Sequence, residues 1–135
     1  MEIKMTEKQF RRLLDLVYIG NWILNSTRDE DRFEVYDRVE SKLFEQARQQ
    51  GMPALAQRAD GVTYPSQAFV DGGIHEAILD YEYTVFYEIL AEELARRDMN
   101  FEPINDENFS ELTSRMDEYI AEFEQNGVDN ISLEI

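Results

Sequence analysis

The stretch GIHEAILDYEYTVFYEILAEELARR, residues 73–97, decides the fold class of the chain. Its apolar residues recur at helical spacing, which predicts a long helix over residues 71–98 with Asp71 as its N-cap. Every fourth residue from Glu76 gives a second pattern, a stripe rich in carboxylates. The stripe comprises Glu76, Asp80, Thr84, Glu88, Glu92 and Arg96. It could be a metal site, a surface for a basic partner or the solvated side of a helix, and each interpretation implies a different function.

Three further helices are predicted around this one. The first spans residues 6–24 and starts with a capping box, in which Thr6 accepts from a helical N–H while Gln9 reaches back. The last spans residues 105–125, and residues 51–70 form an irregular loop that could hold one helical turn. The second spans residues 30–49, with a buried stripe of Phe33, Tyr36, Val39, Leu43 and Ala47.

The two ends of the chain, MEIKM at residues 1–5 and ISLEI at residues 131–135, alternate apolar and polar residues. Alternation is typical of short strands, so we expect the ends to pair as a small two-stranded sheet. A length of 135 residues fits one domain. The predicted fold is therefore mainly α: a four-helix-bundle-like single domain over residues 1–135, with this minor pairing of the N- and C-terminal segments.

The second half of the first helix is apolar on almost every side. A helix of this kind is buried on every side, either at the centre of a bundle or in a dimer interface. We therefore expect a homodimer, because one small bundle does not easily cover so much apolar surface. The predicted interface residues are Tyr18, Ile19, Trp22 and Ile23.

The net charge of −16 is concentrated in one half of the chain. Residues 1–70 carry 11 acidic and 10 basic side chains, a net charge of −1, whereas residues 71–135 carry 18 and 3, a net charge of −15. Direct binding of nucleic acid or an anionic membrane is not expected, because both require Lys and Arg to neutralise phosphate. A basic protein, a polyamine or a divalent cation would be attracted instead. The plainer alternative is that these acids only solvate helical surfaces.

Other features of the composition narrow the function further. The chain has no cysteine, which excludes disulfides, thiolate metal sites and cysteine nucleophiles. Neither a phosphate loop nor a Gly-x-Gly-x-x-Gly motif is present, so no cofactor is predicted. No signal peptide is seen, and the most apolar window, residues 13–24, is too short to span a bilayer. We therefore expect a cytoplasmic protein that does not bind membranes.

The only histidine, His75, lacks the partners of known metal motifs. Position 72 is Gly and position 79 is Leu, so both the Glu-x-x-His spacing of helical di-metal sites and the zinc-protease spacing fail. We expect His75 at the edge of the core, and we expect Tyr81, Tyr83 and Tyr87 to be core or core-margin residues because they recur at helical spacing.

Carboxylates alone could still hold Mg²⁺ or Mn²⁺, which prefer oxygen ligands. In carboxylate richness the chain resembles the helical nucleotide pyrophosphohydrolases, which carry metal on Glu-x-x-Glu and Glu-x-x-Asp pairs across two helices. Here the intervals are four residues rather than three, from Glu88 to Glu92 and from Glu107 to Glu111. The resemblance implies a carboxylate-ligated Mg/Mn enzyme as the alternative function, with Glu88 and Glu92 as the ligands.

The leading hypothesis is a non-enzymatic protein-interaction module, with no metal, whose acidic half binds a basic partner surface. Two versions fit, an adaptor or inhibitor that docks on a basic protein and a DNA mimic whose carboxylates imitate phosphates. The two classes of function differ in one feature, because an interaction surface needs outward-facing acids whereas a metal enzyme needs acids that converge. The predicted interaction surface comprises Glu76, Asp80, Glu88, Glu92, Glu107 and Glu111.

Overall fold

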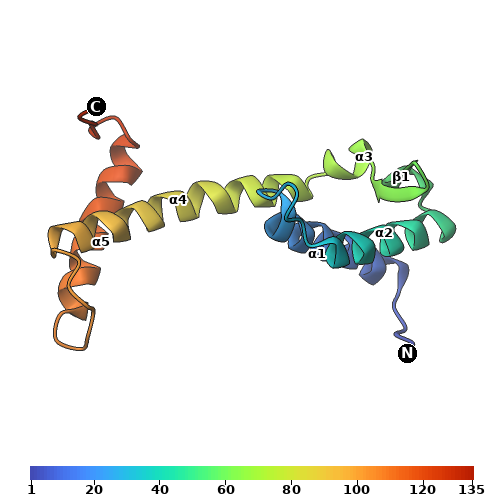
Figure 1. Cartoon of the computed structure of the whole chain (residues 1–135), viewed down its shortest axis with the longest axis horizontal. Coiled ribbons are helices and arrows are strands. Elements are labelled where there is room, and N and C mark those ends of the chain that lie inside the picture. The colour runs from blue at the N-terminus through green and yellow to red at the C-terminus, as the bar shows by residue number, and fades with distance from the viewer. The chain divides into compact units, whose positions relative to one another are not determined.

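The four long helices expected from the sequence are all present in the computed structural model, which describes residues 1–135 (Figure 1). The chain is 63% helical, so the prediction of a mainly α fold is confirmed. A short helix and a 3₁₀ turn add to the long helices. The helical elements are α1 (Glu7–Asn25), α2 (Glu34–Gln49), η1 (Pro53–Leu55), α3 (Gln67–Val70), α4 (Ile74–Asp98) and α5 (Phe109–Asn126).

The chain divides into two compact units, residues 1–78 and 79–135, and the boundary falls within α4. The buried apolar residues likewise form two clusters, one drawn from each unit. We call these parts the first unit and the second unit. The single domain expected from the sequence, in which both units would unfold together, stays a prediction.

The minor sheet lies elsewhere than predicted. It is an antiparallel hairpin of β1 (Ala56–Ala59) and β2 (Val62–Pro65), within the region expected to be an irregular loop. Residues 1–5 and 131–135 form no strand, so the predicted pairing of the terminal segments is wrong. The hairpin turns at Asp60 and Gly61, which both have positive φ values, of 53° and 77°. Two such residues match the twist of the paired strands, which explains why an Asp-Gly pair stands there.

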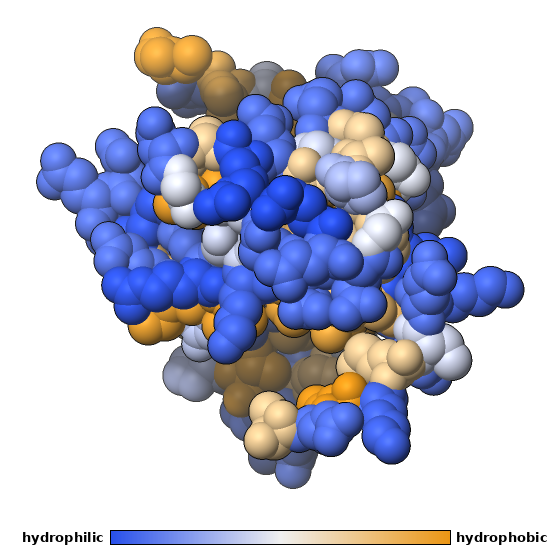
Figure 2. Space-filling model, turned by 90° about the vertical axis from the view of Figure 1, so that its right-hand side faces the viewer, coloured by the Kyte–Doolittle hydropathy of each residue, from blue (hydrophilic) through white to orange (hydrophobic).

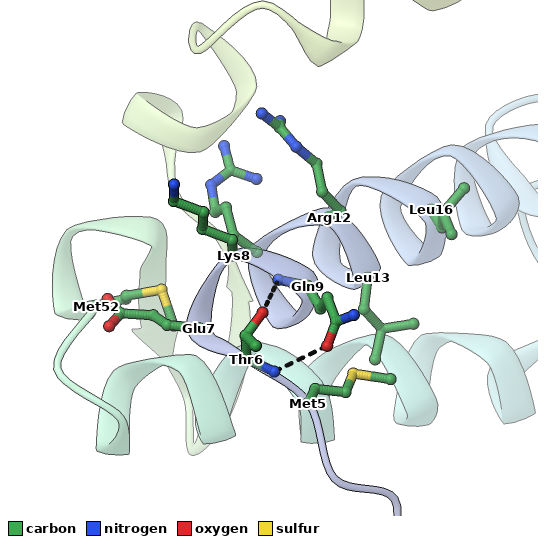
Figure 3. A pocket seen from close by; sticks show the side chains of 10 residues that line it. Met5, Thr6, Glu7, Lys8, Gln9, Arg12, Leu13, Leu16 and Met52 are labelled. Carbon is green, nitrogen blue, oxygen red and sulfur yellow. Dashed lines mark hydrogen bonds between the residues drawn. The ribbon is translucent and has the colours of Figure 1, made fainter.

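Helix α1 begins as the sequence predicts. The Thr6 hydroxyl accepts a hydrogen bond from the Gln9 backbone N–H at 3.1 Å, and Gln9 Oε1 accepts one from the Thr6 backbone N–H at 2.9 Å (Figure 3). Both donors would otherwise lack a helical partner, so the pair stabilises the first turn. The capping box fixes where α1 starts.

The core of the first unit gathers around Phe69 of α3. The Phe69 ring lies edge-on to the rings of Phe44 of α2 and Tyr18 of α1, with 4.8 and 5.4 Å between the ring centroids. The Arg11 guanidinium lies over the same ring, 4.6 Å from its centroid. A helix of only four residues therefore closes this core, because it places one large ring between two long helices. The buried members are Leu14, Tyr18, Phe44, Ala47, Phe69 and Ile78.

The buried face of α2 differs from the predicted stripe. Phe33, Tyr36 and Val39 are exposed, and Phe44 and Ala47 are buried with the half-buried carboxyl of Glu40 on the same side. The hairpin determines this orientation: the Thr63 hydroxyl donates to Glu45 at 2.7 Å, and the Thr63 backbone N–H donates to Ser41 at 3.2 Å. The expected burial of Phe33, Tyr36 and Val39 is therefore wrong, because polar contacts with β2 turn the other face of the helix inward.

The second unit packs α5 against the C-terminal part of α4. Its buried cluster comprises Ala95, Met99 and Leu112, with Ile104, Met116 and Tyr119 against it. The turn between the helices is held by Asn105, whose side-chain oxygen accepts from the backbone N–H groups of Glu107 and Asn108 at 2.9 and 3.2 Å. Helix α5 consequently starts at Phe109, four residues later than predicted.

Candidate functional site

The predicted acidic residues mostly point outward. Glu76, Asp80, Glu88, Glu107 and Glu111 are exposed, and Glu92 is half-buried. Glu92 is paired with Arg96 at 3.2 Å. The structure brings no three His, Asp or Glu side chains close enough to hold one metal ion, Glu88 and Glu92 included. Of the two arrangements that separate the functions, the outward one is observed.

Within the second unit, a groove forms where α4 and α5 meet. It has a volume of about 360 Å³, and its apolar and aromatic lining, which we call the floor, comprises Tyr83, Tyr87, Ile120 and Phe123. Its polar lining, which we call the rim, comprises Thr84 and two exposed carboxylates, Glu88 from α4 and Glu124 from α5. We call this feature the acidic groove. Among the predicted surface residues, Glu88 alone contributes to it.

The aromatic floor of the acidic groove is ordered by ring contacts. The Tyr87 ring lies edge-on to the Tyr83 ring, with 5.2 Å between the centroids, and its centroid is 5.5 Å from that of the tilted Phe123 ring. Burial and the neighbouring Tyr83 raise the pKa of Tyr87, so its hydroxyl stays neutral at physiological pH. The floor therefore offers uncharged aromatic surface, and the charge of the site comes from its carboxylate rim.

The tyrosines of α4 do not behave as one set. Tyr87 is half-buried, as expected, but Tyr81 and Tyr83 are 60% and 68% exposed, so their predicted place in the core is wrong. A helix with apolar residues on several sides cannot bury all of them when a single helix of its unit packs against it. The large apolar residues left exposed between residues 79 and 93 are Leu79, Tyr81, Tyr83, Phe86 and Ile89.

The charge around these residues is almost wholly negative. Residues 79–135 carry 16 acidic and 3 basic side chains, a net charge of −13. All three arginines are already paired within the unit: Arg96 with Glu92, Arg97 with Asp98 at 3.0 Å and Arg115 with Glu111 at 3.1 Å. Asp98 also accepts from the Tyr119 hydroxyl, and these two contacts lower the pKa of its carboxyl. The unit therefore presents carboxylates without any cation left to pair with them.

The residues predicted to form a dimer interface are divided between core and surface. Tyr18 is buried in the first unit, where its hydroxyl forms a 2.8 Å hydrogen bond with His75 Nδ1. Trp22 packs edge-on against the same imidazole at 4.7 Å, which places His75 at the edge of the core as expected. Ile19 is half-buried, and Ile23 is 56% exposed. Of the four residues, Ile23 offers the most surface to a second copy.

The sequence does not single out Glu124, because it stands outside the four-residue stripe of α4 and is one of many acids on α5. The spacing of Ile120 and Phe123 marks the inward side of α5, and Glu124 follows directly at its margin. The spacing of these residues is the only sequence signal that could have pointed to Glu124. It does not indicate which residues of α4 lie opposite Glu124 across the groove.

Comparisons with family models, with curated proteins and with solved structures give no match to this chain. No helix combines the length and the apolar character needed to cross a membrane. The functional argument therefore rests on the geometry and charge described above.

Proposed function

We propose that the second unit is a protein-interaction module that docks on a basic surface of a partner protein. The acidic groove is the observation that carries this proposal. It combines an aromatic floor with two carboxylates at the rim, in a unit whose own arginines are all paired. The groove suits a Lys or Arg side chain, because the floor can take the methylene stem while Glu88 and Glu124 face the charged head.

Three physical contributions support binding of a basic side chain. The faces of Tyr83 and Tyr87 attract a cation through the ring quadrupole. The exposed apolar residues of α4 add surface that a partner would remove from water. The net charge of −13 on residues 79–135 speeds the encounter with a basic partner and makes it sensitive to salt. An adaptor, an inhibitor and a DNA mimic would all use this chemistry.

The test uses a fluorescent peptide of alternating Lys and Leu as the probe, titrated with the full chain. Glu88→Gln combined with Glu124→Gln is expected to weaken binding about tenfold, because two carboxylates facing a cation are lost. The matched control is Asp117→Asn combined with Glu118→Gln, an equal change of charge at exposed sites of α5. If both pairs weaken binding equally, net charge rather than the acidic groove recognises the peptide, and the proposal fails.

The alternative of a carboxylate-ligated Mg/Mn enzyme gains no support from the geometry. Glu88 and Glu92 lie four residues apart on one helix, and no third ligating side chain joins them. Glu92 is also engaged by Arg96. We therefore do not extend the proposal to a metal-dependent reaction.

We also propose that the protein is a homodimer. The proposed interface is a face of α1 that shares only Ile23 with the interface predicted from the sequence. Leu16 and Ile23 of α1 are 68% and 56% exposed, and they lie seven residues apart on one side of the helix. Gly20 lies between them, and nothing stands within 4 Å of the place where its Cβ would be. Figure 2 shows hydrophobic side chains reaching the surface between hydrophilic ones on the face that it draws. A second copy of the chain could cover the exposed apolar side of α1 that carries Leu16 and Ile23.

We expect Ile23→Glu combined with Leu16→Glu to shift a dimer to a monomer, because two charges would have to be buried in the interface. Sedimentation equilibrium of wild type and variant measures the shift. Both side chains are exposed in one chain, so the variant should keep the wild-type helical circular dichroism. A wild-type chain that stays monomeric at high concentration would contradict the dimer.

A further inference from the structure

A second pocket, separate from the acidic groove, opens in the first unit between α1, α2 and the hairpin. Its volume is about 340 Å³. Aromatic side chains from two elements line it, Tyr18 and Trp22 from α1 and Tyr64 from β2, and Glu40 of α2 contributes a carboxyl group. We call it the Glu40 pocket. Its residues all belong to the first unit, so it is independent of the function proposed above.

Two polar residues of this pocket, Arg32 and Asn21, are already engaged. Arg32 forms two hydrogen bonds with Asp37, at 2.8 and 3.0 Å, and a third nitrogen reaches the Asn25 carbonyl at 3.4 Å. The Asn21 amide donates to Asp37 at 3.0 Å and accepts from Asn25 at 2.7 Å. The positive charge of Arg32 is thus neutralised before any ligand arrives.

Glu40 is the exception. Its carboxyl is half-buried, and its hydrogen-bond donor is the Asn21 amide, which also donates to Asp37 at 3.0 Å. The guanidinium of Arg32, the cation of this pocket, is bound by Asp37 instead. An ionised carboxylate that is half-buried and has no paired cation is costly, so the pocket holds one acidic group that no basic side chain of the chain neutralises.

We propose that the Glu40 pocket binds an alkylammonium group, with the Glu40 carboxylate as its counter-ion. The rings of Trp22, Tyr18 and Tyr64 would surround the apolar stem, as aromatic side chains do in known ammonium sites. The ammonium group could come from a free amine or from a lysine side chain of another protein. Both share the chemistry that the pocket recognises.

The protonation of Glu40 makes the proposal sensitive to pH. The pKa of the Glu40 carboxyl is raised to about 7, chiefly by burial. Asp37 adds to this rise, and the Asn21 amide and Arg32 oppose it. Tyr18 of α1 and Tyr64 of β2 also face the pocket, and His75 of α4 bonds the Tyr18 hydroxyl. Since a cation binds the ionised carboxylate, affinity should rise about tenfold from pH 6 to pH 8.

Trp22 is the only tryptophan of the chain, so its fluorescence reports on this pocket. The full chain is titrated with n-butylammonium chloride, with n-butanol as the neutral analogue and with sodium chloride at equal ionic strength. Saturable change with the amine alone is expected. A parallel titration with Nα-acetyl-lysine methylamide separates the two sources: equal binding supports a lysine side chain as ligand, and weaker binding supports a free amine.

Glu40→Gln keeps the shape of the side chain and should abolish both the saturable signal and its dependence on pH. Glu34→Gln, an exposed change on the same helix outside this pocket, should preserve them, and so should Glu88→Gln in the acidic groove. His75→Asn separates titration of the imidazole from that of Glu40, because the dependence on pH should remain. Equal binding of n-butanol, undiminished binding by Glu40→Gln or the absence of a saturable signal at pH 8 would overturn the proposal.

Discussion

Replacing Phe44 by alanine should destabilise the first unit by about 3–5 kcal/mol, among the largest effects that we expect from a single substitution. Its side chain has no exposed surface and touches the Phe69 ring at 4.8 Å. Truncation therefore removes the favourable burial of one ring and leaves a cavity beside the other. Because a domain is typically stable by only about 5–15 kcal/mol, much of the first unit would unfold under mild denaturant.

Hydrogen exchange resolved by residue measures this prediction. Amide protection in α1 and α2 should fall in Phe44→Ala, whereas α5 should keep its protection because its cluster of Ala95, Met99 and Leu112 is separate. The control is Phe86→Ala, which removes the same ring from an exposed position. A loss of less than about 1 kcal/mol would contradict the buried position of Phe44. Equal loss of protection in α5 would instead establish a single cooperative domain.

Glu40→Gln should raise the stability of the protein above pH 7 and leave it almost unchanged near pH 4. The pKa of this carboxyl is raised from 4.5 to about 7 in the folded chain, so the folded state holds a proton that the unfolded state has lost between these values. The contribution of this proton to the free energy of unfolding is fully present below pH 4.5 and is lost as the pH rises through 7. Glutamine cannot ionise, so the variant avoids that loss.

The gain at pH 8 should be about 1–2 kcal/mol. The full shift would give about 3 kcal/mol at about 1.4 kcal/mol per pKa unit, but water still reaches part of the carboxyl and screens it. Urea unfolding at pH 4, 6 and 8 measures the difference. Glu45→Gln is the control of opposite sign, because Arg48 and Thr63 hold the pKa of Glu45 at about 2 and the variant loses the negative charge that pairs with Arg48. If the free energies of unfolding of Glu40→Gln and wild type differed by the same amount at all three pH values, this result would contradict the raised pKa of Glu40.

The helices could be predicted from the sequence because their signals are local. The capping box of Thr6 and Gln9 depends on residues three apart, and the start of α1 follows from it. The hairpin also had a local signal, Asp60-Gly61 before the β-branched pair Val62-Thr63, which the interpretation of residues 51–70 as a loop overlooked. Its first strand, AQRA, contains no residue that favours strands.

The sites could not be predicted because they depend on which elements meet. The apolar stripe on α2 favoured burial of Tyr36 and Val39, but contacts of Thr63 with Ser41 and Glu45 turn the helix so that the Glu40 side faces inward. Tyr87 was predicted as a core or core-margin residue, but its partner was not: the distance of 5.5 Å between the centroids of Tyr87 and Phe123 follows from the packing of α5 on α4. Spacing along one helix carries no information about such partners.

The turn at Asp60 and Gly61 also gives experimental access to the molecule. Both residues are exposed and lie at the tip of a two-residue turn. Exposed tips of this kind tolerate inserted segments and new chain ends better than paired backbone does. A short epitope or a dye-labelling sequence could be inserted there without changing any residue of the aromatic core of the first unit. The chain could then be immobilised or followed in a cell through a tag placed at this turn.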